Sequence, residues 1–247
     1  MFFVLLWRNQ PPYKTTTMKR TDLLFVLAIA AIFLPFVLFT PLYEWYKAFN
    51  ASHGMVMSFL KFGVLSTMGE MLGSRLSTGR YVGPNFGVLP RMIVWGVLGM
   101  GINMAMIIFS KGTPIFMEYM GVERAVELFT AEGFTMTKLW VALAVSVAMN
   151  TIFAPVFMTF HKITDAHIAA HGGSLRALIT PIPMAERFAA IDWNAQWGFV
   201  FKKTIPLFWY PAHTITFLLP AEQRVLFAAL LGIVLGVLLA LSKKKSK

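Results

Sequence analysis

The residues best suited to chemistry lie in an apolar stretch at positions 55–72, which contains one carboxylate, Glu70. At about 100° per residue, small and polar side chains share one helical face around it. They are Gly63, Ser66, Thr67, Glu70, Gly73, Ser74 and Ser77. A carboxylate inside a membrane helix costs about 2–3 kcal/mol or more unless it is paired or hydrated. We therefore expect Glu70, with Ser66 and Thr67, to line a cavity or pore, or Glu70 to form a structural ion pair with Arg75 or Arg91.

A second set of polar residues belongs to two later apolar stretches. Asn150 shares a helical face with Ser146, and a buried amide needs hydrogen-bond partners, so we expect it to bridge helices or to line a pore. His213 has Trp209 four residues before it and Thr216 three residues after it. We expect His213 and Thr216 to be satisfied packing residues or to line the same cavity as Glu70.

Four side chains of metal-binding type follow at helical spacing: His161, Asp165, His167 and His171. On a continuous helix the first pair and the second pair face different directions. Gly172 and Gly173 are expected to end that helix. A solvated helix end near lipid headgroups accounts for these residues better than a metal site, so we predict no metal and no cofactor.

Signatures of soluble enzymes are missing. No Gly-rich phosphate loop follows a strand, and neither a nucleophile elbow nor an H-E-x-x-H motif occurs. The chain contains 0 Cys, which removes disulfides, thiolate metal sites and Cys nucleophiles. The sequence favours a protein that is not an enzyme.

Composition indicates a membrane protein. Hydrophobic residues make up 57% of the 247 positions and charged residues only 13%, with a mean hydropathy of +0.66. Soluble domains contain about 25% charged residues. The net charge of +11 is gathered in short clusters beside apolar runs, a distribution typical of membrane orientation. The expected partner is the lipid bilayer, and nucleic acid is not expected.

Six apolar segments are read as membrane spans. They cover residues 23–41, 55–72, 91–110, 139–160, 204–219 and 221–241. The fifth segment is short and contains Pro211, which we expect to interrupt it, so a full crossing there is left open. The predicted fold class is all-α, a polytopic membrane helix bundle. Residues 1–21 form a basic arm, 22–242 a single transmembrane domain and 243–247 a basic tail.

The basic residues predict the orientation of this bundle. Of 22 Lys and Arg residues, sixteen fall on the side of the two termini and five on the opposite side, with Lys61 inside a span. By the positive-inside rule, both termini then lie on the cytoplasmic (or matrix) side. Lys61 is expected to extend its ammonium group toward the outer interface, with a role in substrate binding as the alternative.

Two glycine pairs, Gly69/Gly73 and Gly232/Gly236, have the four-residue spacing that lets helices approach closely. Such a contact can lie within one chain or between chains. A homo-oligomer through either pair is therefore one prediction, and a contact within the chain is the other.

Several blocks occur in an order that resembles a known family. The C-terminal block comprises Tyr210, Pro211, His213, Thr216, Phe217, Pro220 and Arg224. The upstream blocks are Gly69-Glu70 and Phe153-Ala154-Pro155, the latter preceded by Met149-Asn150. Together they resemble the signature of the Mpv17/PMP22 family of integral membrane proteins, Trp-Pro-x-x-Gln-x-x-Asn-Phe-x-x-x-Pro-x-x-x-Arg with its preceding Gly-Asp and Phe-Ala-Pro blocks. Tyr for Trp, His for Gln and Thr for Asn depart from the pattern and mark a divergent member, such as a prokaryotic one.

The resemblance implies a compact helical protein of a bacterial cytoplasmic membrane, or otherwise of a mitochondrial inner or peroxisomal membrane. It also implies channel-like passage of small solutes. The leading hypothesis is thus a channel or transporter for small solutes or metabolites, lined by Glu70, Asn150, His213 and Thr216. The alternative is a non-conducting membrane scaffold or assembly factor. A membrane-embedded enzyme ranks third and would depend on the cluster at 161–171.

Overall fold

The computed structural model describes residues 19–243 and the side chains of the last helix only in part. The described residues form helices, turns and loops and contain no strand, so the all-α prediction is confirmed. Most of the predicted basic arm and the predicted tail from residue 244 lie outside the described residues.

The chain divides into two compact units, one ending at Phe49 and the other covering Asn50–Lys247. The first unit contains α2 (Arg20–Leu38) and most of α3 (Thr40–Ser52). The Phe36 ring meets the Tyr46 ring edge to face, with centroids 5.4 Å apart. Neither helix buries any side chain, and the composition of α2 is apolar on all sides. A helix that is apolar all round is typical of a membrane span.

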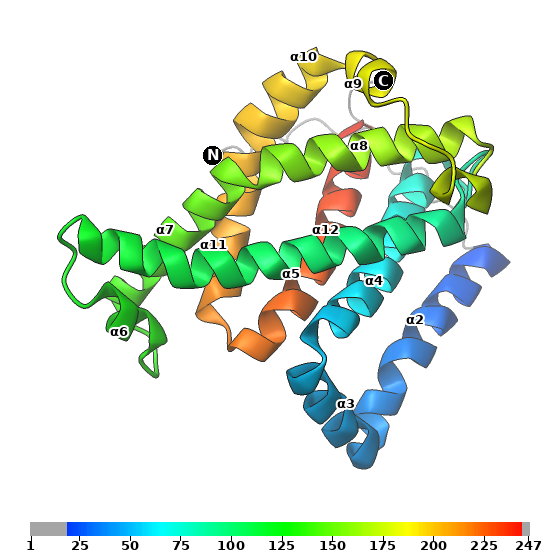
Figure 1. Cartoon of the computed structure of the whole chain (residues 1–247). Helices are drawn as coiled ribbons and strands as arrows, with labels where there is room; N and C mark the ends of the chain where they lie inside the picture. Colours follow the sequence, from blue (N-terminus) through cyan, green and yellow to red (C-terminus); the bar gives the residue numbers. More distant parts are fainter. Residues whose placement is uncertain (1–18, 244–247) are drawn as a thin grey trace, which may run out of the picture. The chain divides into compact units, whose positions relative to one another are not determined.

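The second unit is arranged around α4 (Gly54–Thr78), which packs against α5 (Val88–Tyr119) and α12 (Ala221–Lys243) (Figure 1). Glycines allow these close contacts. A Cβ atom at Gly63 would lie 2.8 Å from the Met92 carbonyl oxygen, and one at Gly69 would lie 3.0 Å from the Ile233 Cα. The α4–α5 interface therefore has no room for a side chain at position 63, and the α4–α12 interface is tight at position 69.

Of the two predicted glycine pairs, Gly69 is thus covered by α12 within the chain. Gly232 lies on α12 near Ser66, since a Cβ atom there would be 3.8 Å from the Ser66 Oγ. The surroundings of Gly236 lie outside the described residues. The contact within the chain is present, and the homo-oligomer stays a prediction.

A second helix pair consists of α7 (Met136–Ile152) and α11 (Tyr210–Leu218), which pack against each other. After Phe153 the chain bends by 44° into α8 (Ala154–Ala170). Pro155 lies in the first turn of α8, where the backbone N–H groups have no partner within the helix, so its missing N–H costs nothing. In a straight helix running through this point, the backbone N–H of residue 155 would be needed as a hydrogen-bond donor. The segment expected as the fourth span is therefore two helices.

Shorter elements connect these helices. They are α6 (Ala125–Thr130), the 3₁₀-helix η1 (Leu175–Leu178), α9 (Met184–Ala189), α10 (Trp193–Ala195) and the π-helix η2 (Gln196–Trp209). The segment expected as the fifth span comprises the end of η2 and all of α11. The interruption predicted at Pro211 takes the form of a change in helix type rather than a break in the helix. The helix type changes between Trp209 and Tyr210, and Pro211 is accommodated in the first turn of α11.

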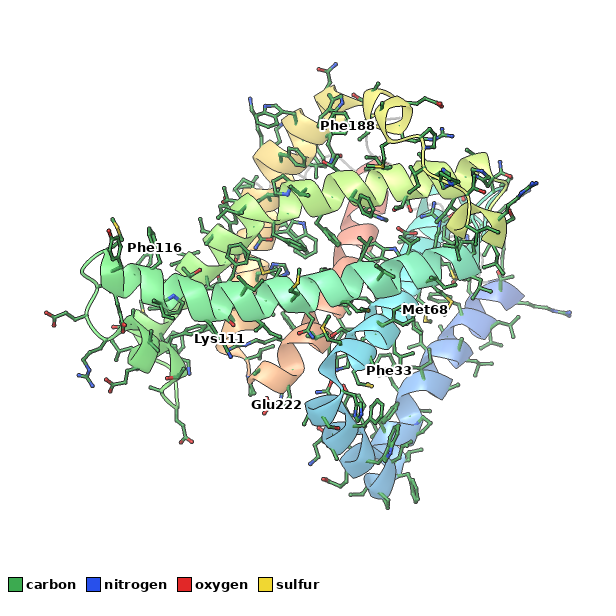
Figure 2. The ribbon with its side chains drawn as sticks, viewed as in Figure 1. Phe33, Met68, Lys111, Phe116, Phe188 and Glu222 are labelled. Carbon is green, nitrogen blue, oxygen red and sulfur yellow. The ribbon has the colours of Figure 1, made fainter. Side chains whose placement is uncertain are left out.

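Among the described residues, α2, α4 and α5 are each long and apolar enough to cross a membrane, and the bent pair α7–α8 makes a fourth candidate. Large apolar side chains are exposed along α5, among them Val97, Met104, Ile107, Ile108 and Phe116. Figure 2 shows Phe116 projecting outward near the end of α5. This exposure fits an integral membrane protein, in which hydrocarbon covers such a surface. The six-span count stays a prediction.

Candidate functional site

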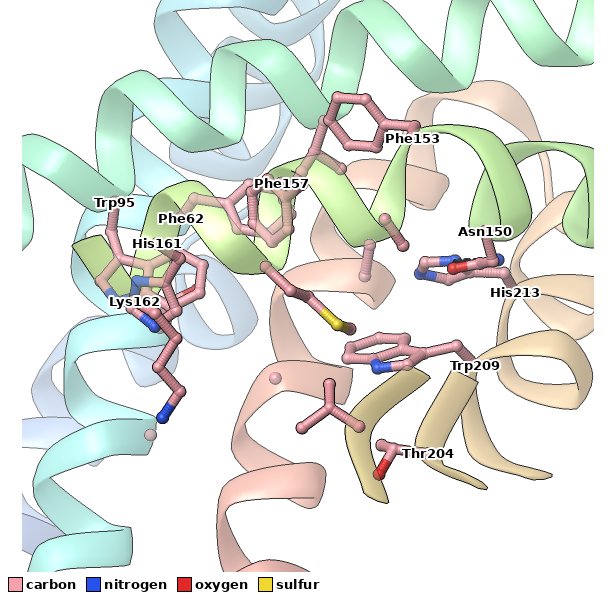
Figure 3. Close-up of a pocket in the computed structure, with 18 of the residues that line it drawn as sticks. Phe62, Trp95, Asn150, Phe153, Phe157, His161, Lys162, Thr204, Trp209 and His213 are labelled. Carbon is pink, nitrogen blue, oxygen red and sulfur yellow. Dashed lines mark hydrogen bonds between the residues drawn. The ribbon is translucent and has the colours of Figure 1, made fainter. Parts of the chain in front are cut away.

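A cavity of about 290 Å³ lies inside the second unit (Figure 3). Its walls come from α4, α5, α7, α8, η2, α11 and α12. The middle of the wall is apolar and includes Phe62, Ile102, Met149, Phe153, Phe157 and Met158. Polar groups of the wall gather at two places. We call them the charged end (Glu70 and His161, with Arg91 and Asp165 bonded behind the wall) and the neutral end (Asn150, Trp209 and His213, with Ser146 bonded behind the wall).

The charged end is held together by one arginine. Arg91 Nη1 donates to Glu70 Oε2 at 2.6 Å and to Asp165 Oδ1 at 2.6 Å. Its Nε donates to the Phe86 carbonyl oxygen at 2.7 Å. The Arg91 side chain is 11% exposed, and the two carboxylate side chains are 20% and 24% exposed. This arginine therefore ties α4, α5 and α8 together through a largely buried ion-pair network.

His161 completes the charged end. Its Nε2 lies 3.2 Å from Glu70 Oε1 and 3.7 Å from Asp165 Oδ2. The His161 ring packs on Trp95 with centroids 4.4 Å apart, and Figure 3 shows the two rings side by side. Because Glu70 contacts both Arg91 and His161, the structural ion pair expected for this carboxylate is present, with Arg91 as the partner.

Glu70, His161 and Asp165 offer ligand atoms within 4.8 Å of one another, a geometry that can hold a metal ion. Arg91 already supplies a cation to one oxygen of each carboxylate, Glu70 Oε2 and Asp165 Oδ1, whereas His161 Nε2 faces the other oxygen of each. The other two candidate ligands lie elsewhere. His167 Nε2 faces the Thr180 carbonyl oxygen at 3.2 Å, and His171 Nδ1 faces the His167 carbonyl oxygen at 2.9 Å. The first pair and the second pair thus face different surroundings, as their helical spacing predicts.

The neutral end joins α7 to α11. The Asn150 side-chain amide donates to the Ser146 carbonyl oxygen at 2.8 Å and lies 3.0 Å from His213 Nδ1. Ser146 Oγ donates to the Tyr210 carbonyl oxygen at 2.8 Å. The Trp209 and His213 rings are packed with centroids 5.0 Å apart, as Figure 3 shows. Asn150 therefore bridges two helices, as the sequence predicts.

The π-helix η2 contributes a wall that the sequence analysis missed. Gln196, Val200, Thr204 and Trp209 line the cavity at spacings of four, four and five residues. A π-helix closes i→i+5 hydrogen bonds and so has more residues per turn than the 3.6 of an α-helix. The Tyr210 N–H, which donates to the Ile205 carbonyl oxygen, shows this i→i+5 pattern. Only this wider winding brings Trp209 to the same face as Gln196.

The structure places four of the six residues predicted to line a cavity in the cavity wall. Glu70, Ser66, Asn150 and His213 line the cavity. Thr67 is fully buried on α4 and is not part of the cavity wall, and Thr216 Oγ1 donates to the Ala212 carbonyl oxygen at 3.0 Å.

Lys61 is 7% exposed and donates to Asn50 Oδ1 at 2.5 Å. The Asn50 side-chain oxygen, near the end of the preceding helix α3, accepts this hydrogen bond, and the prediction that the ammonium group reaches the outer interface stays a prediction.

The positions that carry the family resemblance have clear structural surroundings. Arg224 Nε donates to the Leu219 carbonyl oxygen and its Nη2 to the Phe217 carbonyl oxygen, each at 3.0 Å. These bonds satisfy carbonyl groups that α11 leaves free at its C-terminus. Pro220 stands between α11 and α12, and the Tyr210 hydroxyl lies 2.7 Å from Thr151 Oγ1. The Phe153-Ala154-Pro155 block forms the bend between α7 and α8.

Comparisons of the chain with protein-family models, with curated proteins and with solved structures found no match. The fold and the site therefore define the class of the protein by themselves. Over its described residues it is a helical protein with several helices fit to cross a membrane and a cavity lined by its helices.

Proposed function

We propose that this chain is an integral membrane protein of a bacterial cytoplasmic membrane that moves a small solute through the cavity between its helices. The observation that carries the proposal is the cavity itself. Protein interiors are normally packed with few voids larger than a water molecule. An opening of about 290 Å³ lined by polar groups at two places has the properties of a binding site. Transport is proposed in preference to catalysis.

The arrangement of spans belongs to the same proposal. Six crossings with both termini on the cytoplasmic side place sixteen of the 22 basic residues on that side and five opposite. The resemblance to the Mpv17/PMP22 family supports the same architecture, and we propose that the chain is a divergent member. The positions that carry the resemblance contribute to the bend beside the cavity and to the cap of α11, both of which hold cavity-lining residues in place.

A second function, a non-conducting scaffold, is favoured by one specific observation. Glu70 is paired with Arg91, and Asn150 is bonded to Ser146 and lies beside His213. Polar residues that satisfy one another hold helices together without any solute. The experiment must therefore separate a cavity that admits molecules from one that only tolerates buried polar groups.

Cysteine accessibility separates the two functions, because the chain has 0 Cys of its own. Ser66 lines the cavity and its neighbour Thr67 does not, although both are buried on α4. Ser66→Cys and Thr67→Cys would each be reconstituted in liposomes and treated with a small methanethiosulfonate reagent. We expect modification of Ser66→Cys within minutes and little modification of Thr67→Cys.

Solute flux is then measured on the same liposomes with a panel of small metabolites. Transport predicts a flux that falls when Ser66→Cys is modified and that changes in Glu70→Gln, while the exposed control Glu123→Gln leaves it unaltered. A flux equal to that of empty liposomes, together with a lowered melting temperature of Glu70→Gln, would favour the scaffold and reject transport.

A further inference from the structure

We infer that the cavity binds a small organic acid, an apolar body carrying a carboxylate, read by N–H donors of the π-helix η2. This inference rests on the proposed function, because it names the class of solute that the same cavity would take. It is drawn from the hydrogen-bonding groups of the cavity wall that the protein leaves without partners.

The first observation concerns two donors on η2. The Gln196 side chain is only 2% exposed, and its amide nitrogen has no hydrogen-bond partner among the described residues. The indole nitrogen of Trp209 is likewise buried without a partner in the described part of the chain. A buried donor left unpaired is costly, and a tryptophan N–H can only donate. Both residues line the cavity, so an acceptor atom inside it would remove this cost.

The second observation is that the carboxylate and amide oxygens of the opposite walls are already engaged. Glu70 interacts with Arg91 and His161, and Asn150 Oδ1 lies 3.1 Å from His213 Nδ1. A ligand rich in hydrogen-bond donors would have to compete with these existing bonds for the same oxygen atoms. A ligand rich in hydrogen-bond acceptors would instead meet the unpaired N–H groups of Gln196 and Trp209. The cavity therefore favours an acceptor group such as a carboxylate over an amine.

The third observation is a cation without a counter-ion. Lys162 lines the cavity beside His161, and the described residues hold no ion pair to its ammonium group (Figure 3). The neighbouring guanidinium of Arg91 is already shared by Glu70 and Asp165. Lys162 is thus the cavity-lining cation that no carboxylate of the described residues engages, and its ammonium group favours a carboxylate over a neutral carbonyl.

The remaining wall sets the body of the ligand. Phenylalanine, methionine and isoleucine side chains form its middle, so the body of the ligand is apolar. The volume of about 290 Å³ is at the lower limit of ligand pockets, which hold roughly 300–1,000 Å³. A carboxylic acid with a short alkyl chain or a single ring fits these limits, whereas a phospholipid does not.

Equilibrium binding of radiolabelled hexanoate to the full chain in lipid nanodiscs tests the inference. Hexylammonium, which has the same alkyl chain and a donor-only headgroup, is the matched probe, and empty nanodiscs give the partition into lipid. We expect saturable binding of hexanoate and none of hexylammonium. Trp209→Phe and Gln196→Leu should each weaken hexanoate binding about tenfold, the loss expected for one hydrogen bond to a charged group.

Two exposed residues provide the controls. Trp140→Phe and Gln223→Leu make the same chemical changes outside the cavity and should bind hexanoate like the wild-type chain. Lys162→Met alters an exposed side chain, so it is expected to fold, and it should also weaken binding about tenfold. Equal binding of hexylammonium, no saturable hexanoate binding, or unchanged binding in all three cavity variants would overturn the inference.

The outcome is independent of flux. Hexanoate binding without flux of any solute supports the ligand class and rejects transport. Flux of other solutes without hexanoate binding supports transport and rejects the ligand class.

Discussion

At the charged end of the cavity a single guanidinium joins α4, α5 and α8, whereas at the neutral end an amide and an imidazole join α7 to α11. Both ends bury polar atoms in an apolar bundle. The charged end does so with two carboxylates whose desolvation is offset only while Arg91 stays between them. The neutral end carries no net charge, so each of its bonds has a small net value in the membrane.

This difference separates two tasks. The charged end fixes the positions of α4, α5 and α8. Removing one charged side chain from it leaves a buried charge without a partner. The neutral end holds its helices more weakly and lies beside the unpaired donors of η2. We therefore expect stability to depend mainly on the first end and ligand recognition mainly on the second.

The largest expected effect is that of removing the shared cation. Arg91→Ala leaves Glu70 and Asp165 as neighbouring carboxylates without a guanidinium, and breaking such a buried pair costs about 3–5 kcal/mol. For a chain of this size, that corresponds to a fall in melting temperature of roughly 6–20 °C. The measurement is thermal unfolding of the detergent-purified protein, followed by loss of the monodisperse peak.

The control removes the charges together. Arg91→Met combined with Glu70→Gln and Asp165→Asn contains no unpaired charge and should recover most of the lost stability. An Arg91→Ala protein that melts like the wild type would show that the charged end does not hold the helices.

The next effect tests whether the charged end depends on the spacing of α4 and α5. Gly63→Ala places a methyl group 2.8 Å from the Met92 carbonyl oxygen, one residue after Arg91. Overpacking of this kind costs about 1–3 kcal/mol. Gly101→Ala is the matched control on α5, where no atom of the described residues beyond the adjoining turns of the helix lies within 4 Å of the added carbon. Because alanine favours a helix over glycine by about 1 kcal/mol, this control should melt at or above the wild-type temperature.

The comparison of the two ends also explains what the sequence could predict. A carboxylate inside an apolar helix must find a partner, so Glu70 could be selected and Arg91 named as one of two candidates. The same reasoning about helical faces separates His161 and Asp165 from His167 and His171. That Glu70 meets the first pair could not be predicted, because the contact depends on the bend at Phe153 and on how α8 then crosses α4.

The η2 wall was missed for a different reason. Helical faces were assigned with α-helical periodicity, and on that winding Gln196 and Trp209 lie on nearly opposite sides. The π-helix brings them together through i→i+5 bonds that depend on tertiary packing rather than on residue propensity. The apolar character of the segments and the all-α class were predictable because both follow from composition alone.

A smaller effect is expected at the neutral end. Asn150→Ala and His213→Ala each remove one side of the contact between α7 and α11. Interhelical hydrogen bonds in membrane proteins contribute about 0.6 kcal/mol on average and up to roughly 1–2 kcal/mol. A double-mutant cycle on the free energies of unfolding should therefore give a coupling energy between Asn150 and His213 that is well below the cost of Arg91→Ala. A coupling as large as that of the ion-pair network would remove the distinction between the two ends.

The smallest effect is expected from an ion pair outside the cavity, which sets the baseline for both ends. Arg124 donates to Glu127 on α6, with both side chains more than half exposed. The hydrogen bond from Arg124 lowers the pKa of Glu127 below its usual value. A lowered folded-state pKa gives stability that is present above the ordinary glutamate pKa of about 4.3 and is lost as the pH falls through the folded-state value.

Arg124→Ala should therefore change the melting temperature at pH 7 by less than about 2 °C, since exposed pairs contribute little. Melting curves at a series of pH values from 7 downward measure this, and the small difference should shrink as the pH falls through the lowered pKa of Glu127. A shift as large as that of Gly63→Ala would mean that surface charge, and not the buried network, sets the stability of this protein.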